Sequence, residues 1–266
     1  MIPIRSGIRG SRPAALLSEG YGYIVNKMRL SYFIREGRIW IFPPFRGKIT
    51  RMEIVLIHLS ALSEDRLSAL FSLLPEAKKE PIKRYRQPMD QIRSASAYAY
   101  LFYLLDKRGY GREVELKTNE HGRPYIPDID FSFSISHSGE YAALAYEEER
   151  IDLGVDIQAH RETESTGIAE SFFAEEERVY LKQKSDPVHA FFDLWTRKEA
   201  YMKARGLGLS IPLSSFSAIE EEVGDYRLLS FDAVEGYSLS LCANKPLKDV
   251  RLSFVSLEDL LSSYGI

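Results

Sequence analysis

The stretch LWTRKEAYMKARGLGL (residues 194–209) has the composition of a helix that ends in a Gly-x-Gly turn. Trp195, Glu199 and Lys203 recur at intervals of four residues, so they share one broad face of this helix. A solvent-exposed Glu–Lys pair would explain the two charges, although such a pair contributes only about 0.3–0.5 kcal/mol. It would not explain the tryptophan or the glycine turn. The helix is therefore either an ordinary solvated surface or the wall of a functional site.

The segments before and after this helix predict a mixed α+β fold. Residues 53–59 have the apolar composition of a strand, and FSFSISHSGEYAALAY (residues 131–146) alternates apolar and polar side chains around a Ser-Gly turn. This second pattern is typical of a β-hairpin. A further strand, IDLGVDIQ (residues 151–158), alternates in the same way, so its polar face carries Asp156 and Gln158.

Helices are expected between these strands. We predict them from Ser63, from Pro75 with an interruption at Pro81, over residues 90–109 and over residues 168–183. The glycine and two prolines of EHGRPYIPD (residues 120–128) should prevent regular structure there. Residues 216–255 have the pattern of several strands, and a short helix follows near Leu257. No internal repeat is visible in the sequence.

The composition is that of a soluble globular protein. The chain has 266 residues, 45% of them hydrophobic and 27% charged. The longest apolar run, residues 97–105, is too short to cross a bilayer, and the N-terminal residues lack a secretory hydrophobic segment. A single cysteine, Cys242, rules out an intrachain disulfide and a cysteine-rich metal site. We expect a cytoplasmic protein.

Charge is distributed unevenly along the chain. Residues 1–51 contain ten Lys or Arg and two Asp or Glu, a net charge of +8, whereas the remainder has 25 basic and 36 acidic residues, or −11. Such a difference indicates a separate segment. We expect residues 1–51 to form a basic, poorly ordered N-terminal extension. A nucleic-acid or membrane arm is the alternative, but its basic residues are scattered and form no clean amphipathic face.

Asp156 and Glu199 are the candidate metal ligands. A lone carboxylate on a strand is more often an edge residue, but two that converge would bind a hard divalent cation through oxygen. Mg²⁺ favours one or two carboxylates together with substrate phosphates and water. Lys203, one helical turn beyond Glu199, would then face a phosphate. The chain has no Walker A loop and no kinase signature, so phosphoryl chemistry here requires another fold.

His137, in SISHSG, lies at the end of a strand before a tight turn. A lone histidine is more often a hydrogen-bonded structural residue than a catalyst. Ser136, Ser138 and the backbone N–H groups of the turn would nevertheless make a small anion cradle. Most of the basic residues between Lys78 and Arg123 are expected to be solvated.

Taken together, these residues resemble a 4′-phosphopantetheinyl transferase of the surfactin-synthetase-activating type. The resemblance covers residues 52–255 and rests on four motifs in the order typical of the family. The motifs are EHGRPYIPD (120–128), FSISHS (133–138), GVDIQ (154–158) and LWTRKEAYMKARGLGL (194–209). Each motif alone is weak, but four in order with matching spacing are specific.

The resemblance implies both a reaction and a fold. The enzyme would transfer the phosphopantetheine arm of coenzyme A to a serine of an apo acyl or peptidyl carrier protein and release 3′,5′-ADP. The fold would be a pseudo-twofold pair of similar α/β subdomains with coenzyme A in the cleft between them. The first half would cover residues 52–150, and the second, residues 151–266, would carry the metal site.

The resemblance also assigns roles to the matched residues. Asp156 and Glu199 match the metal-binding carboxylates, where Mg²⁺ would bridge them to the pyrophosphate. Glu199 additionally matches the residue proposed to help deprotonate the carrier serine. Lys203 matches the lysine that would neutralise or protonate the departing phosphate, and Trp195 would buttress the helix.

The remaining matched residues would bind the nucleotide end of coenzyme A. Ser136 and His137 match residues that contact its 3′-phosphate end, and Arg123 matches a basic residue near the adenine. Lys78 and Arg93 match phosphate contacts in the family's basic N-terminal region, through an alignment that needs a gap.

Gln158 departs from the family pattern. Many relatives have Asp-x-Glu where this chain has Asp156-Ile157-Gln158. A glutamine offers a carbonyl oxygen without charge, so the third metal ligand becomes weaker or is replaced by water, and we expect a lower affinity for Mg²⁺. Glu177 matches a further acidic position, so it either supports the metal from outside the ligand set or is an exposed helix acid.

Three alternatives remain. The chain could be a non-catalytic descendant that binds coenzyme A or a carrier protein, as Gln158 would suggest. It could be an unrelated Mg²⁺-dependent nucleotide enzyme, or a nucleic-acid binder acting through residues 1–51. We expect no nucleic-acid or membrane partner and, because both halves lie in one chain, a monomer. The sequence does not identify the carrier protein.

Overall fold

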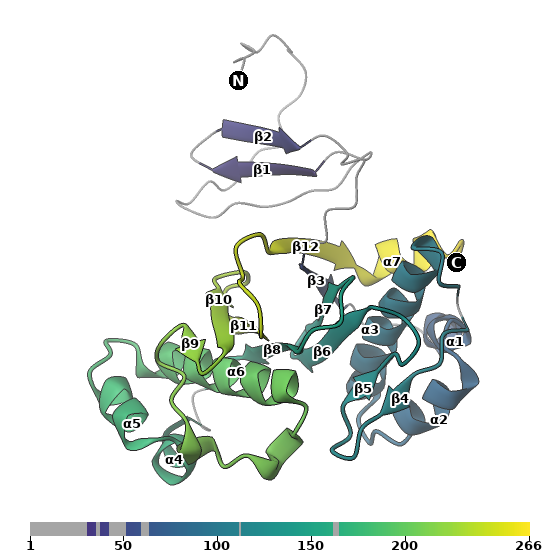
Figure 1. The fold of residues 1–266 in the computed structure, drawn as a ribbon. Coiled ribbons are helices and arrows are strands. Elements are labelled where there is room, and N and C mark those ends of the chain that lie inside the picture. Colours follow the sequence, from purple (N-terminus) through teal and green to yellow (C-terminus); the bar gives the residue numbers. More distant parts are fainter. Residues whose placement is uncertain (1–30, 36–37, 43–51, 60–63, 112, 162–164) are drawn as a thin grey trace. The chain divides into compact units, whose positions relative to one another are not determined.

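The computed structural model describes residues 31–35, 38–42, 52–59, 64–111, 113–161 and 165–266 (Figure 1). The chain divides into two compact units, Met1–Gly47 and Lys48–Ile266. In the first unit, strands β1 (Ser31–Arg35) and β2 (Arg38–Phe42) form an antiparallel pair. The rest of the predicted extension, residues 1–51, lies outside the described residues.

The second unit begins with strand β3 (Glu53–His58) and helices α1 (Glu64–Ser72), α2 (Glu76–Lys83) and α3 (Pro88–Lys107). The short strands β4 (Lys117–Thr118) and β5 (Pro124–Tyr125) follow, and then the hairpin of β6 (Ser132–Ser138) and β7 (Tyr141–Glu147). The predicted strand at residues 53–59 and the hairpin at residues 131–146 are confirmed.

The chain continues with β8 (Leu153–Ala159), α4 (Ser165–Phe172), α5 (Glu175–Lys182) and α6 (Pro187–Arg205). Two 3-10 turns, Gly208–Ser210 and Leu213–Ser215, lead to β9 (Glu222–Val223), β10 (Tyr226–Phe231) and β11 (Tyr237–Ala243). The last elements are β12 (Arg251–Ser256) and α7 (Leu257–Ser263). The α+β class is as predicted.

The two four-stranded sheets of this unit share the arrangement of three of their strands. The sheet orders are β12-β3-β7-β6 and β8-β11-β10-β9. In the first half, β3 pairs antiparallel with β7, and β7 pairs antiparallel with β6. In the second half, β8 pairs antiparallel with β11, and β11 pairs antiparallel with β10. Three helices separate the first strand from the other two, and the third is the longest, with 20 residues in α3 and 19 in α6. The halves are therefore topological repeats that the sequence did not reveal.

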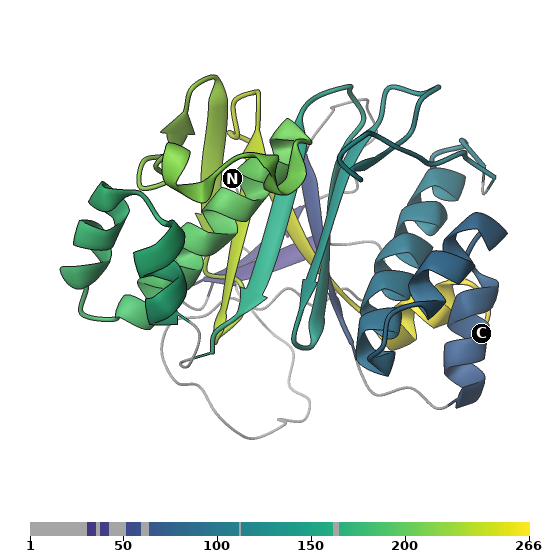
Figure 2. The ribbon, with the colours of Figure 1, turned by 90° about the horizontal axis from the view of Figure 1, so that it is seen from below.

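The C-terminal elements cross between the halves. β12 pairs parallel with β3, and α7 buries Leu257, Leu260 and Leu261 in the core beneath the first sheet. Figure 2 shows α1–α3 and α7 on one side of the strands and α4–α6 on the other. The end of the second half in sequence is thus part of the first half in space.

Serine hydroxyl groups join the two sheets along the seam between β6 and β8. The hydroxyl of Ser132 bonds both backbone groups of Ile151, at 2.8 and 2.9 Å, and those of Ser134 and Ser138 each accept a β8 N–H at 3.0 Å. The alternating serines of FSFSISHS thus face a neighbouring strand edge, whereas a hairpin at the surface would expose them to water. Side chains separate the two edges, which keeps β6 and β8 in different sheets.

Three local predictions were wrong. The helix predicted over residues 168–183 is two helices, α4 and α5, that break at Phe173 and Ala174, both of which are buried. α2 continues through Pro81 for two residues and ends at Lys83. The 120–128 segment is not wholly irregular, since β5 pairs with β4 there. Within the described residues, no helix is long and apolar enough to cross a membrane.

Candidate active site

Asp156 lies where both halves of the unit meet. It is on the β8 face that turns away from the core residues Leu153, Val155 and Ile157, and it is 5% exposed. Its Oδ1 accepts a hydrogen bond of 2.6 Å from Ser136 of β6 and an ion pair of 2.6 Å from Lys203 Nζ of α6. Lys203 also donates to the Val155 carbonyl at 3.1 Å. Three elements therefore converge on one carboxylate.

The other oxygen of this carboxylate, Oδ2, is buried and has no hydrogen-bond partner among the described residues. Leaving a buried acceptor unsatisfied costs about 1–3 kcal/mol, and more when the group is charged. A site that needs a cation or a polar ligand to be complete is expected to contain such a carboxylate oxygen, without a partner and beside a second acidic group.

That second acidic group is Glu199. Burial, followed by the negative charge of Asp156, raises the pKa of Glu199 to about 7, and Lys203 opposes this shift. Glu199 directly precedes Ala200, which packs on Gly154 two residues before Asp156, so the two carboxylates lie on adjoining parts of α6 and β8. A divalent cation would relieve both the burial cost and the repulsion. Hence the residues present fit a cation, although no group of three His, Cys, Asp or Glu side chains suited to a metal occurs in the described part of the chain.

Gly154 brings α6 close enough to form this site. A Cβ atom at this position would lie 2.0 Å from the Ala200 carbonyl oxygen and 2.5 Å from the Ala204 nitrogen. Only a residue without a side chain permits this contact between strand and helix. The close approach places Glu199 and Lys203, on either side of Ala200, against the polar face of β8.

His137 and Arg93 belong to the same neighbourhood. Arg93, in α3, donates to the Gly139 carbonyl at 2.7 Å and pairs with Asp90 at 2.6 Å. Burial, then the positive charge of Lys203, lowers the pKa of His137; Asp90 opposes this and Arg93 adds to it. His137 is therefore neutral near pH 7. Asp90 is a site neighbour that the sequence alone did not single out, since it resembles an ordinary first-turn acid.

Two serines make contacts that their pattern did not predict. Ser136 was expected to contact the nucleotide, and Ser136 with Ser138 to line an anion cradle. In the structure Ser136 donates to Asp156, and Ser138 accepts the Ala159 N–H of β8 at 3.0 Å. Both hydroxyls contribute to the seam between the halves and to the position of Asp156.

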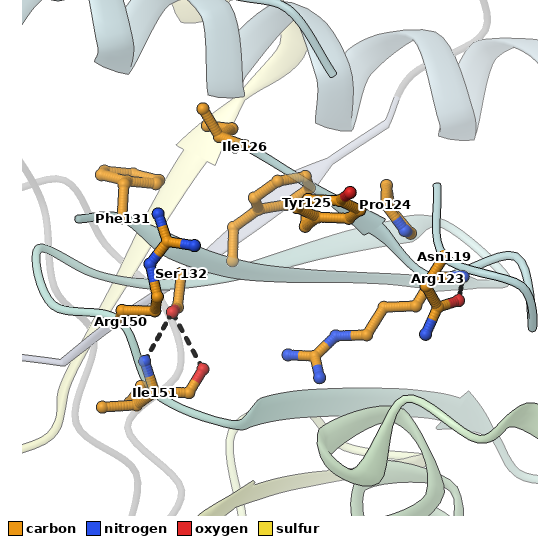
Figure 3. Close-up of a pocket in the computed structure, with 10 residues that line it drawn as sticks. Asn119, Arg123, Pro124, Tyr125, Ile126, Phe131, Ser132, Arg150 and Ile151 are labelled. Carbon is orange, nitrogen blue, oxygen red and sulfur yellow. Dashed lines mark hydrogen bonds between the residues drawn. The ribbon is translucent and has the colours of Figure 1, made fainter. Parts of the chain in front are cut away.

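Arg123 ties the 119–125 turn to the end of α6. Its guanidinium donates to the Ala204 carbonyl at 2.7 Å and the Leu153 carbonyl at 3.1 Å. Burial lowers the pKa of Arg123, which Asp152 opposes. A cavity of about 190 Å³ adjoins it, and Figure 3 shows the side chains of Arg123 and Arg150 among its lining residues.

Lys78 and Gln158 make no described contact with the acidic pair. The Lys78 ammonium lies 4.7 Å from the centre of the Tyr98 ring, and burial lowers its pKa. Gln158 is half-buried two residues beyond Asp156 on the same face of β8, opposite Ser238 of β11. The structure therefore brings together Asp156, Glu199, Lys203, Ser136, His137 and Arg93.

The interpretation of Glu177 as an exposed helix acid was wrong, and its support of the metal stays a prediction. Its side chain is fully buried and pairs with Lys198 Nζ at 2.7 Å, also fully buried. Glu177 further accepts the N–H groups of Ala174 and Ala218, so it joins the start of α5 to the segment after α6. Lys198 immediately precedes Glu199, but the sequence offered no sign that its charge is internal. As expected, Trp195 has a structural position, stacked on Phe173 and Phe191.

The site and fold thus define an α+β protein of two topologically matched halves, with an acid–lysine cluster at their seam. Two family models match these halves: "4′-phosphopantetheinyl transferase, N-terminal" over residues 61–149, and "4′-phosphopantetheinyl transferase superfamily" over residues 152–255. The matched regions divide the chain between β7 and β8.

Curated relatives agree with these models. The chain is 30% identical to the 4′-phosphopantetheinyl transferase Sfp of Bacillus subtilis (strain 168) over 220 residues, which cover 75% of this chain and 95% of the relative. It is 33% identical over 211 residues to another 4′-phosphopantetheinyl transferase of Bacillus subtilis, with coverages of 71% and 88%. The chain belongs to the 4′-phosphopantetheinyl transferase superfamily.

Proposed function

We propose that this chain transfers the 4′-phosphopantetheine group of coenzyme A to a serine of an apo acyl or peptidyl carrier protein, with Mg²⁺ as cofactor. Family membership supports the reaction class. The observation that carries the proposal for the site is the meeting of Asp156, Glu199 and Lys203 around a buried, unpartnered carboxylate oxygen.

Asp156 and Glu199 would hold the cation, and Gln158 would contribute a neutral oxygen or leave that position to water. When bound, Mg²⁺ supplies positive charge against the pyrophosphate oxygens. Oxygen ligands are what this ion prefers, and Asp156 already presents one oxygen with no partner among the described residues.

The transfer forms one bond and breaks another. The carrier serine oxygen attacks the phosphorus that bears the pantetheine arm, and the bond from this phosphorus to the leaving 3′,5′-ADP oxygen breaks. Glu199 would accept the serine proton, directly or through water, which is the role that the family resemblance gives it. Lys203, 2.6 Å from Asp156, would neutralise or protonate the departing phosphate.

His137, Arg93, Arg123, Lys78 and Ser136 are proposed to bind the nucleotide. A neutral His137 can donate one N–H to a phosphate oxygen, and Arg93 lies beside it. Arg123 retains donors beyond its two carbonyl bonds. Lys78 would have to leave the Tyr98 ring, so it is the weakest of these assignments.

The test is intact mass spectrometry of apo carrier proteins incubated with the chain, coenzyme A and Mg²⁺. The expected result is a mass gain of one phosphopantetheine group that a chelator abolishes. Glu199→Ala should lower the rate by roughly 10²–10³-fold or more, the loss typical of removing a charge-stabilising group. Glu80→Ala, which removes an exposed glutamate of α2, is the matched control and should not change the rate.

A non-catalytic binding protein is the second candidate, and Gln158 is the observation that favours it. It predicts coenzyme A binding with no mass gain on fatty-acid, polyketide or peptide carriers. Removing residues 1–51 separates the transferase from a nucleic-acid binder: transfer should persist in residues 52–266, whereas nucleic-acid affinity would vanish. The monomeric state and the cytoplasmic location remain predictions.

A further inference from the structure

Two histidines meet at the end of β8 and the start of α6, beyond the acid–lysine cluster. His160 directly follows β8, and His189 lies in the first turn of α6. Their ring centroids are 5.3 Å apart, with an interplanar angle of 80°. Neither residue has a part in the proposed transfer reaction.

The His160 ring is held in place by its surroundings. Its Nε2 lies 3.0 Å from the Ser238 hydroxyl of β11, and its plane stacks on Phe192 at 5.1 Å. Within the described residues no group bonds its Nδ1. When Nε2 donates to Ser238, Nδ1 carries the free lone pair. A hydrogen bond from one imidazole nitrogen that orients the other is the usual arrangement around metal-binding histidines.

His189 supplies the second imidazole. It is exposed, so its ring can turn without disturbing the core. Two histidines that ligate one tetrahedral ion through bonds of about 2.0–2.1 Å have ring centroids roughly 5 Å apart. The observed 5.3 Å meets this requirement. Asp186, whose carboxylate caps α6 by accepting the His189 N–H at 3.0 Å, adds negative charge nearby.

We propose that His160 and His189 form a binding site for a transition-metal ion such as Zn²⁺, Ni²⁺ or Cu²⁺, with water in its remaining positions. Imidazole nitrogen suits these ions, whereas Mg²⁺ prefers the oxygen ligands of the acidic pair. The two sites therefore differ in chemistry. Because no third side chain completes the pair in the described part of the chain, the site is exchangeable. An ion bound there links the end of β8 to α6, the elements that carry Asp156 and Glu199.

The test is isothermal titration calorimetry of the full chain with Ni²⁺ in the presence of excess Mg²⁺, which occupies the oxygen ligands. One equivalent should bind. His189→Ala should weaken binding at least tenfold without a change of fold, because this side chain is exposed. His160→Asn should do the same, with circular dichroism to check its fold.

His121→Ala is the matched control, since it removes a partly exposed histidine outside the pair, and it should bind Ni²⁺ like the parent chain. Glu199→Gln should also bind Ni²⁺ unchanged, which separates this site from the acidic pair. The proposal is overturned if the parent chain binds no Ni²⁺, if His189→Ala binds it equally well, or if His121→Ala or Glu199→Gln abolishes the binding.

Discussion

The buried pair of Glu177 and Lys198 allows a quantitative test of how this fold supports its site. Lys198 Nζ contacts Glu177 at 2.7 Å and donates to the carbonyls of Leu213 and Phe216 at 2.7 and 2.6 Å. Both side chains are 0% exposed. Burial lowers the pKa of Lys198, and its bond to Glu177 opposes that shift. The pair is thus fully desolvated and fully bonded.

Lys198→Met keeps an unbranched side chain, one atom shorter and without charge, and it leaves the Glu177 carboxylate buried with two N–H donors. Breaking a buried pair in this way costs about 3–5 kcal/mol. This is a large part of the 5–15 kcal/mol by which domains are typically stable, and it corresponds to a decrease in Tm of roughly 6–20 °C. Urea unfolding followed by tryptophan fluorescence measures it, because Trp195 stacks on Phe173 in the same core.

The matched control is Lys83→Met, which removes the partner of the exposed Glu80 and should cost less than about 1 kcal/mol. The double variant Glu177→Gln/Lys198→Met removes both charges, so it should be more stable than Lys198→Met alone. The reasoning is refuted if Lys198→Met lowers the stability no more than Lys83→Met does. It is also refuted if adding Glu177→Gln to Lys198→Met lowers the stability by as much again.

Three further predictions concern the site itself. Gly154→Ala should push α6 away from β8, with a loss of several-fold or more in transferase rate, whereas Gly167→Ala, where a Cβ meets open space, should leave the rate unchanged. Glu199 has a folded pKa raised from 4.5 to about 7, so its contribution to stability is complete below pH 4.5 and is lost as pH rises through 7. In Mg²⁺-free thermal unfolding, Glu199→Gln should therefore stabilise the chain relative to the parent at pH 8 and not at pH 4.5; equal differences at both would contradict the shift. Gln158→Glu should lower the Mg²⁺ concentration for half-maximal transfer, and identical half-saturation in both forms would show that position 158 does not reach the ion.

Local patterns in the sequence determined much of this protein. The alternation of apolar residues in β8 was enough to place Asp156 and Gln158 on the face opposite Leu153, Val155 and Ile157, because side chains on a strand alternate between two faces. The four ordered motifs identified the family. The absence of a side chain at Gly154 permits the close approach that α6 makes.

Tertiary structure alone decided the rest. The repeat of the two halves lies in strand order and helix length, which do not require similar residues, so no sequence comparison within the chain revealed it. Glu177 has the pattern of an exposed helix acid, yet it is buried because Lys198 and two backbone N–H groups from distant segments neutralise and bond it. Likewise, the contact that Ser136 makes depends on a neighbouring strand. Its hydroxyl reaches Asp156 only because β8 lies against β6. Long-range contacts of this kind depend on which surfaces pack together, and local spacing carries no record of them.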